Sequence, residues 1–345
     1  MPELRKDPIV GRWVIIATER AMRPGNIVDF NGSGKEDKSD ECPFCEHHES
    51  MVPPEICAIR DHHSQANAAG WKVRVVPSRK PFLKIESHFQ RRGHGLYDVV
   101  NGFGAHEIII ETPQHIANMA DLDVPQIQLV IQTYVIRYND LERNPQLKFV
   151  MAYKNFERTL GPGKAAHSRS QIIATPVNPM RTKDKLIGAR HYFQYHDRCI
   201  YCDLIHQEKE AQKRLVLETE HFIVLTPFAS RFPFEVWILP KKHHCDFAKG
   251  VTGMEGDLAK ALKETLLKIK NGLNNPDYNF VVHSAPFRRE RTITTDWKTI
   301  EDDFHWHIEV MPRLTRVAGF EKGTGFYICS IPPEQTAEYL RGVKV

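Results

Sequence analysis

The chain repeats one order of motifs twice, and this repeat limits the folds that its 345 residues can adopt. Each copy begins with a Cys-x-x-Cys pair, at residues 42–45 and 199–202, and continues with a Ser-Arg-x-Pro-Phe turn, at 78–82 and 230–234. A strand that leads to a histidine, an amphipathic helix, an Asn-Pro pair and a last strand then follow in the same order. We therefore predict an α+β fold built from two tandem units, each an antiparallel sheet with packed helices.

The two halves are expected at residues 1–180 and 190–345, joined by the charged stretch 181–190. The helix of the first half begins after Asp123, which can cap it, and Pro125 suits its first turn. Apolar side chains at helical spacing give each helix one core-facing side. These side chains are Ile127, Val130, Ile131, Tyr134, Val135, Tyr138 and Leu141 in the first half, and Leu258, Leu262, Leu266, Ile269 and Leu273 in the second.

The composition is that of an ordinary globular protein, with 41% hydrophobic and 26% charged residues. No apolar run approaches the roughly 20 residues that a membrane helix needs, and the N-terminal residues lack the apolar region of a signal peptide. The net charge of +4 is mild and spread along the chain, so neither a nucleic acid nor a membrane is expected as a partner. We expect a cytoplasmic protein.

Four of the seven cysteines lie in the two Cys-x-x-Cys pairs, which in a cytosolic protein favour metal binding or redox chemistry over disulfides. Each half adds a histidine just after a strand and another on the last strand. Two thiolates and two imidazoles form the usual closed tetrahedral zinc site, so we predict two structural zinc ions. In the second half, His244 in place of His243, or a core without metal, remains open. The predicted ligands are Cys42, Cys45, His115 and His167, and then Cys199, Cys202, His243 and His305.

The stretch from Asn155 to Pro176 is the candidate functional segment. A Gly/Pro-rich passage leads into a strand in which His167, Arg169 and Gln171 point to one face, and serines to the other. An imidazole, a guanidinium and a carboxamide beside a Gly-rich loop suit a ligand that carries phosphate. The alternative is a polar edge strand beside a loop.

Taken together, the motifs resemble the galactose-1-phosphate uridylyltransferase family of the histidine-triad superfamily, over nearly the whole chain. The resemblance implies two histidine-triad-like halves, zinc, a homodimer, and transfer of a nucleotidyl group between a sugar nucleotide and a sugar 1-phosphate through a histidine intermediate. The motifs that carry it are Leu4 to Pro8 with Trp13-Val14, Arg20, Arg23-Pro24, Cys42 to Cys45, His115, His167 to Gln171, Cys199/Cys202, His305-Trp306-His307, and Gly319 to Gly325.

The chain departs from the family motif, His-Pro-His-x-Gln or His-Ser-His-x-Gln, at one position. His167 matches the zinc-binding histidine and Gln171 the phosphate-orienting glutamine, but Arg169 stands where the family has its nucleophilic histidine. A guanidinium is protonated at any accessible pH and has no lone pair to attack with, although it can hold phosphate and stabilise charge in a transition state. His307, placed by the repeat where Arg169 lies in the first half, is the substitute nucleophile that we consider.

The resemblance also implies substrate-binding residues. Arg20 and Arg23 look like phosphate-contacting arginines, Asn155 like the asparagine before the Gly-rich loop, and Phe320 and Glu321 like a hexose-binding pair. Ser170, within the His167-to-Gln171 motif, is expected to contact the substrate as well.

Two classes of function follow. The first is a nucleotidylyltransferase of the UDP-glucose:hexose-1-phosphate uridylyltransferase type, with an ADP-sugar phosphorylase-like adenylyltransferase as its variant. The two-zinc pattern resembles plant ADP-glucose phosphorylase. The second class is a sugar-nucleotide-binding protein that has lost covalent catalysis. A nucleotidyl adduct would show that a side chain is a nucleophile, and exchange of labelled galactose 1-phosphate or phosphate without an adduct would support direct displacement. Binding with neither outcome would support the second class.

Overall fold

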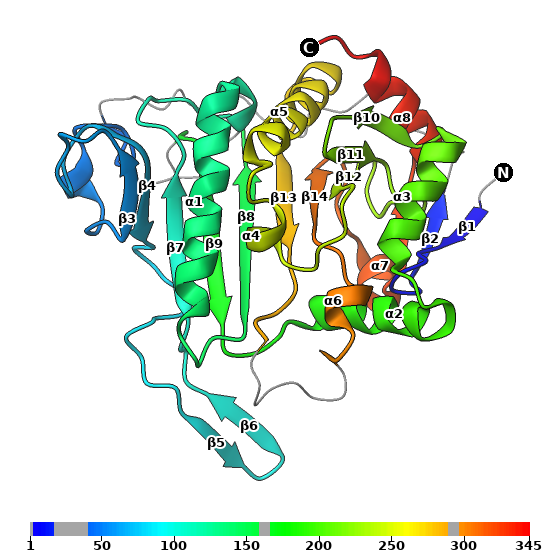
Figure 1. The fold of residues 1–345 in the computed structure, drawn as a ribbon, viewed down its shortest axis with the longest axis horizontal. Coiled ribbons are helices and arrows are strands. Elements are labelled where there is room, and N and C mark those ends of the chain that lie inside the picture. Colours follow the sequence, from blue (N-terminus) through cyan, green and yellow to red (C-terminus); the bar gives the residue numbers. More distant parts are fainter. Residues whose placement is uncertain (1–2, 17–40, 159–165, 289–296) are drawn as a thin grey trace.

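A computed structural model describes residues 3–16, 41–158, 166–288 and 297–345. Its main feature is a ten-stranded sheet, counted over the described residues, in which each pair of neighbouring strands is antiparallel (Figure 1). Their order across the sheet is β10-β11-β12-β14-β13-β8-β9-β7-β4-β3. The strands are β3 (Cys57–Arg60), β4 (Trp71–Pro77), β7 (Ala105–Ile110), β8 (Phe149–Phe156), β9 (Arg169–Thr175), β10 (Leu215–Glu218), β11 (Phe222–Leu225), β12 (Val236–Pro240), β13 (Tyr278–His283) and β14 (His307–Pro312).

The two halves of the chain meet where β8 pairs with β13. Tyr153 lies opposite Val281 and Lys154 opposite Phe280 in this antiparallel pair. On each side of it the strands follow the same order outward, with β9 corresponding to β14 and β7 to β12. The α+β class predicted from the repeat is therefore confirmed, and the two copies form one continuous sheet.

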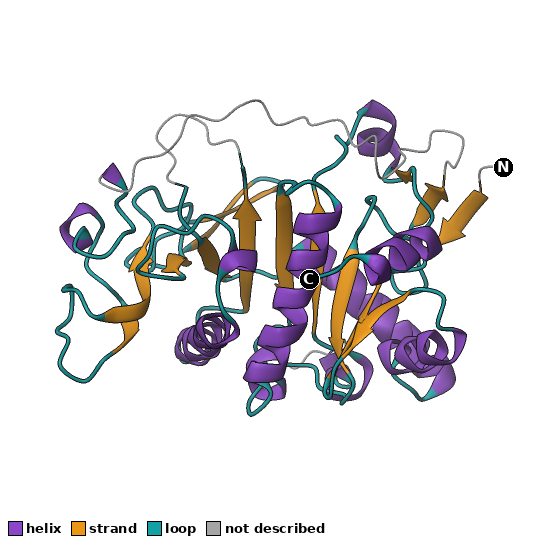
Figure 2. Ribbon diagram, turned by 90° about the horizontal axis from the view of Figure 1, so that it is seen from above, coloured by secondary structure: helices purple, strands orange, loops and turns teal. Residues whose placement is uncertain are grey.

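Two long helices, α1 (Val124–Glu142) and α5 (Glu255–Gly272), cover one face of this sheet and pack against each other (Figures 1 and 2). The side chain of Asp123 caps α1 by accepting a hydrogen bond from the Gln126 N–H at 2.8 Å. The helical-spacing prediction is correct except for Val135, which is only partly buried. In the first half, alternate side chains of β9 point away from these helices, to the opposite face of the sheet.

The remaining elements lie around the sheet. A three-stranded sheet joins the N-terminal segment to the C-terminal region in the order β1-β2-β15, and β5 and β6 form a separate hairpin. No helix in the described ranges is long and apolar enough to cross a membrane. These elements are β1 (Glu3–Lys6), β2 (Trp13–Ile16), β5 (Arg91–His94), β6 (Tyr97–Val100), β15 (Tyr327–Cys329), η4 (Glu49–Met51), η5 (Met119–Asp121), α2 (Met180–His196), α3 (Ile200–Ala211), α4 (Phe247–Gly250), α6 (Ile300–Asp303), α7 (Gly319–Thr324) and α8 (Pro333–Gly342).

Candidate functional site

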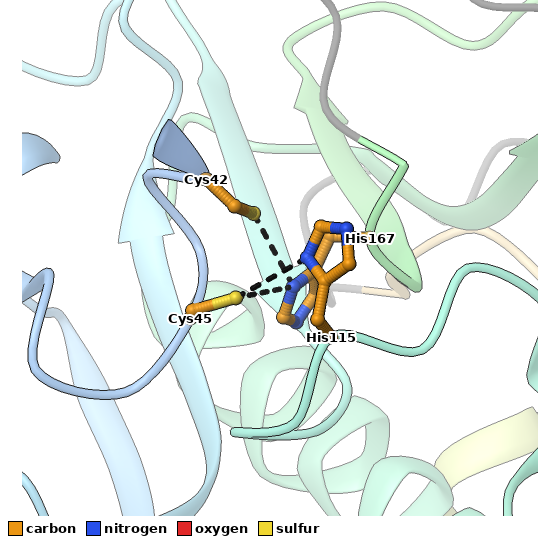
Figure 3. Close-up of side chains that lie close together, drawn as sticks. All are labelled: Cys42, Cys45, His115 and His167. Carbon is orange, nitrogen blue, oxygen red and sulfur yellow. Dashed lines mark hydrogen bonds between the residues drawn. The ribbon is translucent and has the colours of Figure 1, made fainter. Parts of the chain in front are cut away.

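The first Cys/His group lies at the start of β9 and joins three separate segments of the chain (Figure 3). Cys42 and Cys45 come from one tight turn, His115 follows β7, and His167 precedes β9. The Cys42 Sγ lies 3.5 Å from the His167 Nδ1, and the Cys45 Sγ lies 3.3 Å from the His115 Nδ1 and 3.7 Å from the His167 Nδ1. All four predicted ligands therefore converge.

These distances fit a tetrahedral zinc ion. Bonds of about 2.3 Å to sulfur and 2.05 Å to nitrogen, at a tetrahedral angle, put the two ligand atoms about 3.6 Å apart. His167 turns its Nδ1 to the group because its Nε2 donates to the Thr112 carbonyl at 2.8 Å. Burial also lowers the pKa of His167 to about 4, which keeps the imidazole neutral, as a metal ligand must be.

The second group, around Cys202, repeats this geometry in the other half. Its Sγ lies 3.4 Å from the His243 Nδ1 and 3.6 Å from the His305 Nδ1, and Cys199 completes the set. The second nitrogens of both histidines again donate to backbone carbonyls, at 2.8 and 2.9 Å. His243, rather than the alternative His244, belongs to this group, since the His244 Nδ1 accepts the Asp246 N–H.

Arg169 begins β9 directly beside the first group. Its Nη1 donates to the His167 carbonyl at 3.0 Å, and its guanidinium lies over the ring of Phe44, 5.2 Å from the centroid. Phe44 stands between the two cysteines of the Cys-x-x-Cys turn. The turn that supplies two of the candidate metal ligands therefore also supports the guanidinium by a cation–π contact.

Gln171 lies two residues along the same strand and is held by two side chains that the sequence analysis did not select. Its Oε1 is 2.8 Å from the His106 Nε2 and accepts the Tyr153 hydroxyl at 2.9 Å. Burial raises the pKa of Tyr153, so its hydroxyl keeps the proton that it donates. His106 comes from β7 and Tyr153 from β8, the two neighbours of β9.

Ser170 lies on the other face of β9, as the alternation of a strand requires. It is buried, and its Oγ accepts the hydroxyl of Tyr134 from helix α1 at 2.7 Å. The expectation that Ser170 contacts the substrate is not supported, because the sheet separates it from Arg169 and Gln171.

A buried ion pair beneath β9 holds its first residues. The Nζ of Lys154 lies 2.5 Å from the Glu111 Oε2 and donates at 3.0 Å to both the Ser168 Oγ and the Arg169 carbonyl. Neither charged side chain is more than 1% exposed. Ser168 and Arg169 lie at the start of β9, and Lys154 lies on the neighbouring strand β8. The ion pair therefore helps to determine where the backbone of Arg169 lies.

We predict that Lys154→Met lowers the free energy of unfolding by about 3–5 kcal/mol, because it leaves the Glu111 carboxylate buried without its partner. Chemical denaturation measures the change. The matched control is Lys72→Met, which removes an exposed pair with Asp61 and should cost less than about 1 kcal/mol. Equal losses in both variants would contradict the prediction, and adding Glu111→Leu to Lys154→Met should restore most of the stability.

His307 is fully buried, unlike a nucleophile that must meet a substrate. Its Nδ1 donates to the His305 carbonyl at 2.9 Å, and its Nε2 faces the Nζ of Lys185 at 2.7 Å. The same Nζ lies 2.6 Å from Glu309. Because both ring nitrogens are engaged, the geometry argues against His307 as the attacking group. Lys185, on helix α2, is a further buried residue that the sequence analysis did not place here.

Of the other predicted substrate contacts that the structure describes, Asn155 lies on the same face of β8 as Tyr153, whereas Phe320 and Glu321 belong to another part of the fold. Asn155 lies near the end of β8 and accepts a hydrogen bond from Asn279 at 2.5 Å. Phe320 and Glu321 lie on α7, whose Glu321 accepts the N–H of Ile328 next to the three-stranded sheet, whereas β9 belongs to the other half (Figure 1). Arg20 and Arg23 lie outside the described residues.

Comparisons with known proteins agree with this architecture. The sequence-family model of the galactose-1-phosphate uridyl transferase N-terminal domain matches residues 1–179. The family model of the C-terminal domain matches residues 186–330. An ADP-glucose phosphorylase from Arabidopsis thaliana is 33% identical, over 100% of this chain and 93% of its own. A galactose-1-phosphate uridylyltransferase from Thermotoga maritima is 26% identical, over 100% and 99%.

Solved structures give the same result. The crystal structure of the Arabidopsis thaliana ADP-glucose phosphorylase with bound ADP-glucose superimposes with a TM-score of 0.80 at 31% identity, and each chain is covered completely. A uridylyltransferase structure superimposes with a TM-score of 0.74 at 25% identity, over 99% of this chain and 97% of the other. With both halves matched, the chain belongs to the galactose-1-phosphate uridylyltransferase family of sugar-nucleotide nucleotidyltransferases.

Proposed function

We propose that the protein binds an ADP-sugar and transfers its adenylyl group to phosphate or to a sugar 1-phosphate. The choice of ADP over UDP rests on the similarity to ADP-glucose phosphorylase along the whole chain. A UDP-sugar is the second candidate, because the relative from Thermotoga maritima is a uridylyltransferase. The protein would act as a homodimer, as the family resemblance implies.

The observation that carries the proposal is the pair of donors at the start of β9. Arg169 and Gln171 lie on the same face of this strand, next to a Cys/His group that anchors its first residue. A guanidinium and a carboxamide NH₂ both donate hydrogen bonds, and together they suit the oxygens of a diphosphate. The Arg169 carbonyl is held by Lys154, which is paired with Glu111, and the Gln171 side chain by His106 and Tyr153.

Because Arg169 replaces the nucleophilic histidine, the reaction that we propose is a direct displacement. An oxygen of the acceptor phosphate attacks the α-phosphorus of the ADP-sugar, and the bond from that phosphorus to the bridging oxygen breaks. The leaving group is the sugar 1-phosphate, and the product is ADP when phosphate is the acceptor. Arg169 and Gln171 would stabilise the negative charge on the oxygens of the α-phosphate in the transition state.

Zinc has a structural part in this proposal. Four protein ligands would close its coordination sphere, so it would supply a rigid link between the Cys-x-x-Cys turn and the strand rather than a position for substrate. Cys42, Cys45, His115 and His167 would hold it in the first half, and Cys199, Cys202, His243 and His305 in the second.

The alternative is a protein that binds the sugar nucleotide without turning it over, which the arginine at position 169 also favours. We therefore expect ADP-glucose to raise the thermal transition more than UDP-glucose or GDP-glucose does at equal concentration. ADP-glucose incubated with labelled phosphate should yield labelled ADP and glucose 1-phosphate, while intact mass of the protein stays unchanged. Tight binding without labelled product would support the binding protein. An adduct on the protein would overturn direct displacement, and no shift with any nucleotide would overturn both functions.

A further inference from the structure

The orientation of the Gln171 carboxamide follows from the backbone N–H of Phe82, in the loop after β4. The N–H of Phe82 points at the Nδ1 of His106 at 3.2 Å. A backbone N–H can only donate, so this nitrogen must be the acceptor of a neutral imidazole, and the ring proton is on Nε2. The His106 Nε2 therefore donates, and the atom that faces it at 2.8 Å must be the Gln171 oxygen.

Tyr153 provides a second donor to the same oxygen, at 2.9 Å. The two lone pairs of the Gln171 Oε1 are then both used. A half-turn of the carboxamide would bring its NH₂ against the His106 N–H, where neither group can accept, and would lose that hydrogen bond, although the Tyr153 hydroxyl could then accept from the NH₂. The orientation with the NH₂ directed away from His106 and Tyr153 is therefore strongly preferred.

We propose that His106 and Tyr153 are positioning residues that hold the Gln171 NH₂ toward the ligand, so that this face of β9 offers hydrogen-bond donors to phosphate oxygens. The inference rests on the proposed function and deepens it, since it specifies which part of the sugar nucleotide Gln171 meets. With Arg169 two residues earlier on the same face, the site selects a ligand rich in acceptor oxygens and disfavours one that presents only hydrogen-bond donors there.

The arrangement depends on the register of three strands. His106 lies 65 residues and Tyr153 18 residues from Gln171 in the sequence. Phe82, whose N–H fixes the His106 tautomer, also stacks on its ring with 4.7 Å between the centroids. His106→Phe removes the donor but keeps a flat ring for this contact, which makes it the variant of choice.

The test is a double-mutant cycle on ligand affinity, measured by isothermal titration calorimetry with ADP-glucose, pyrophosphate and adenosine. We expect His106→Phe and Tyr153→Phe each to weaken ADP-glucose and pyrophosphate about tenfold. In a Gln171→Ala background neither substitution should weaken them further. Adenosine has no phosphate, so its affinity should be the same in the variants as in the wild type.

Tyr138→Phe is the matched control, because it removes a buried hydroxyl that accepts the Ala152 N–H on the helix-covered face. It should leave all three affinities unchanged. Losses from His106→Phe that persist without Gln171, or that extend to adenosine, would overturn the positioning role. Should His106→Phe fail to fold, Tyr153→Phe carries the same cycle.

The two proposals fail in different ways. If the wild-type protein binds neither ADP-glucose nor UDP-glucose but binds pyrophosphate with the expected coupling, the proposed function fails and the positioning role stands. If a sugar nucleotide binds without coupling to Gln171, the positioning role alone is wrong. A wild-type protein that binds no phosphate ligand, pyrophosphate included, would overturn both.

Discussion

Replacing Cys42 with serine should remove one of two zinc ions per chain and lower the free energy of unfolding by more than about 4 kcal/mol. The reason is that the Cys42 Sγ shares a metal-sized space with the Nδ1 of His167, which is 125 residues away in the sequence. Without the metal, the described residues join this turn to the segment after β7 by a backbone hydrogen bond from the Glu46 N–H to the Pro113 carbonyl at 3.1 Å, which is a weaker link than a metal site.

Zinc content by elemental analysis and unfolding by guanidinium chloride measure the two effects on the same preparation. Cys57→Ser is the control, since Cys57 lies in β3 and outside both Cys/His groups. It should keep two zinc ions. Cys199→Ser should lose the other ion, and so should report on the second half. A Cys42→Ser protein that keeps two zinc ions and wild-type stability would show that the first group is not a structural zinc site.

The effect should extend to the function proposed for β9. The Arg169 guanidinium lies over the ring of Phe44, which belongs to the turn that a bound metal would hold, and its Nη1 donates to the carbonyl of the proposed metal ligand His167. Loss of the ion would therefore weaken both of these contacts of the guanidinium. We expect Cys42→Ser to weaken ADP-glucose binding even under conditions in which the protein remains folded.

Much of this site was predictable because its residues repeat in a fixed order. The Cys-x-x-Cys pairs and the histidines after β7 and β12 occupy matching places in the two halves. A metal site requires only that these ligand atoms lie close together in the fold, as they do. The same reasoning gave the α+β class. The two-residue period of a strand gave the alternation along β9, whose partly buried and buried residues follow the predicted faces.

The residues that were missed depend on contacts between strands, which no local pattern reports. His106 and Tyr153 reach Gln171 only because β7 and β8 flank β9 in one particular register. Lys185 reaches His307 from helix α2, in the region predicted as a charged connection between halves. A lysine in a charged stretch is predicted to be solvent-exposed. Lys185 is instead buried against Glu309, because the tertiary packing of helix α2 places it there.

Arg169→His should turn the protein into one that forms a covalent nucleotidyl adduct with its sugar nucleotide. The second half shows how an imidazole sits at the equivalent place: the His307 Nδ1 donates to the carbonyl of His305, two residues earlier. In the first half the carbonyl of His167 already accepts a hydrogen bond from Arg169. An introduced imidazole that uses the same carbonyl would keep its proton on Nδ1 and direct the Nε2 lone pair outward.

That lone pair is what a guanidinium lacks, and the groups that would stabilise the phosphate are already present. Intact mass after incubation with ADP-glucose should show one nucleoside monophosphate per chain in Arg169→His and none in the wild type. Arg169→Ala controls for removal of the cation, and Arg169→His combined with Gln171→Ala should form the adduct much more slowly. If Arg169→His binds ADP-glucose but forms no adduct, the arginine is not the only change that separates this site from covalent catalysis, and the direct-displacement reading gains support. An adduct in the wild type would instead place the nucleophile on a residue other than Arg169.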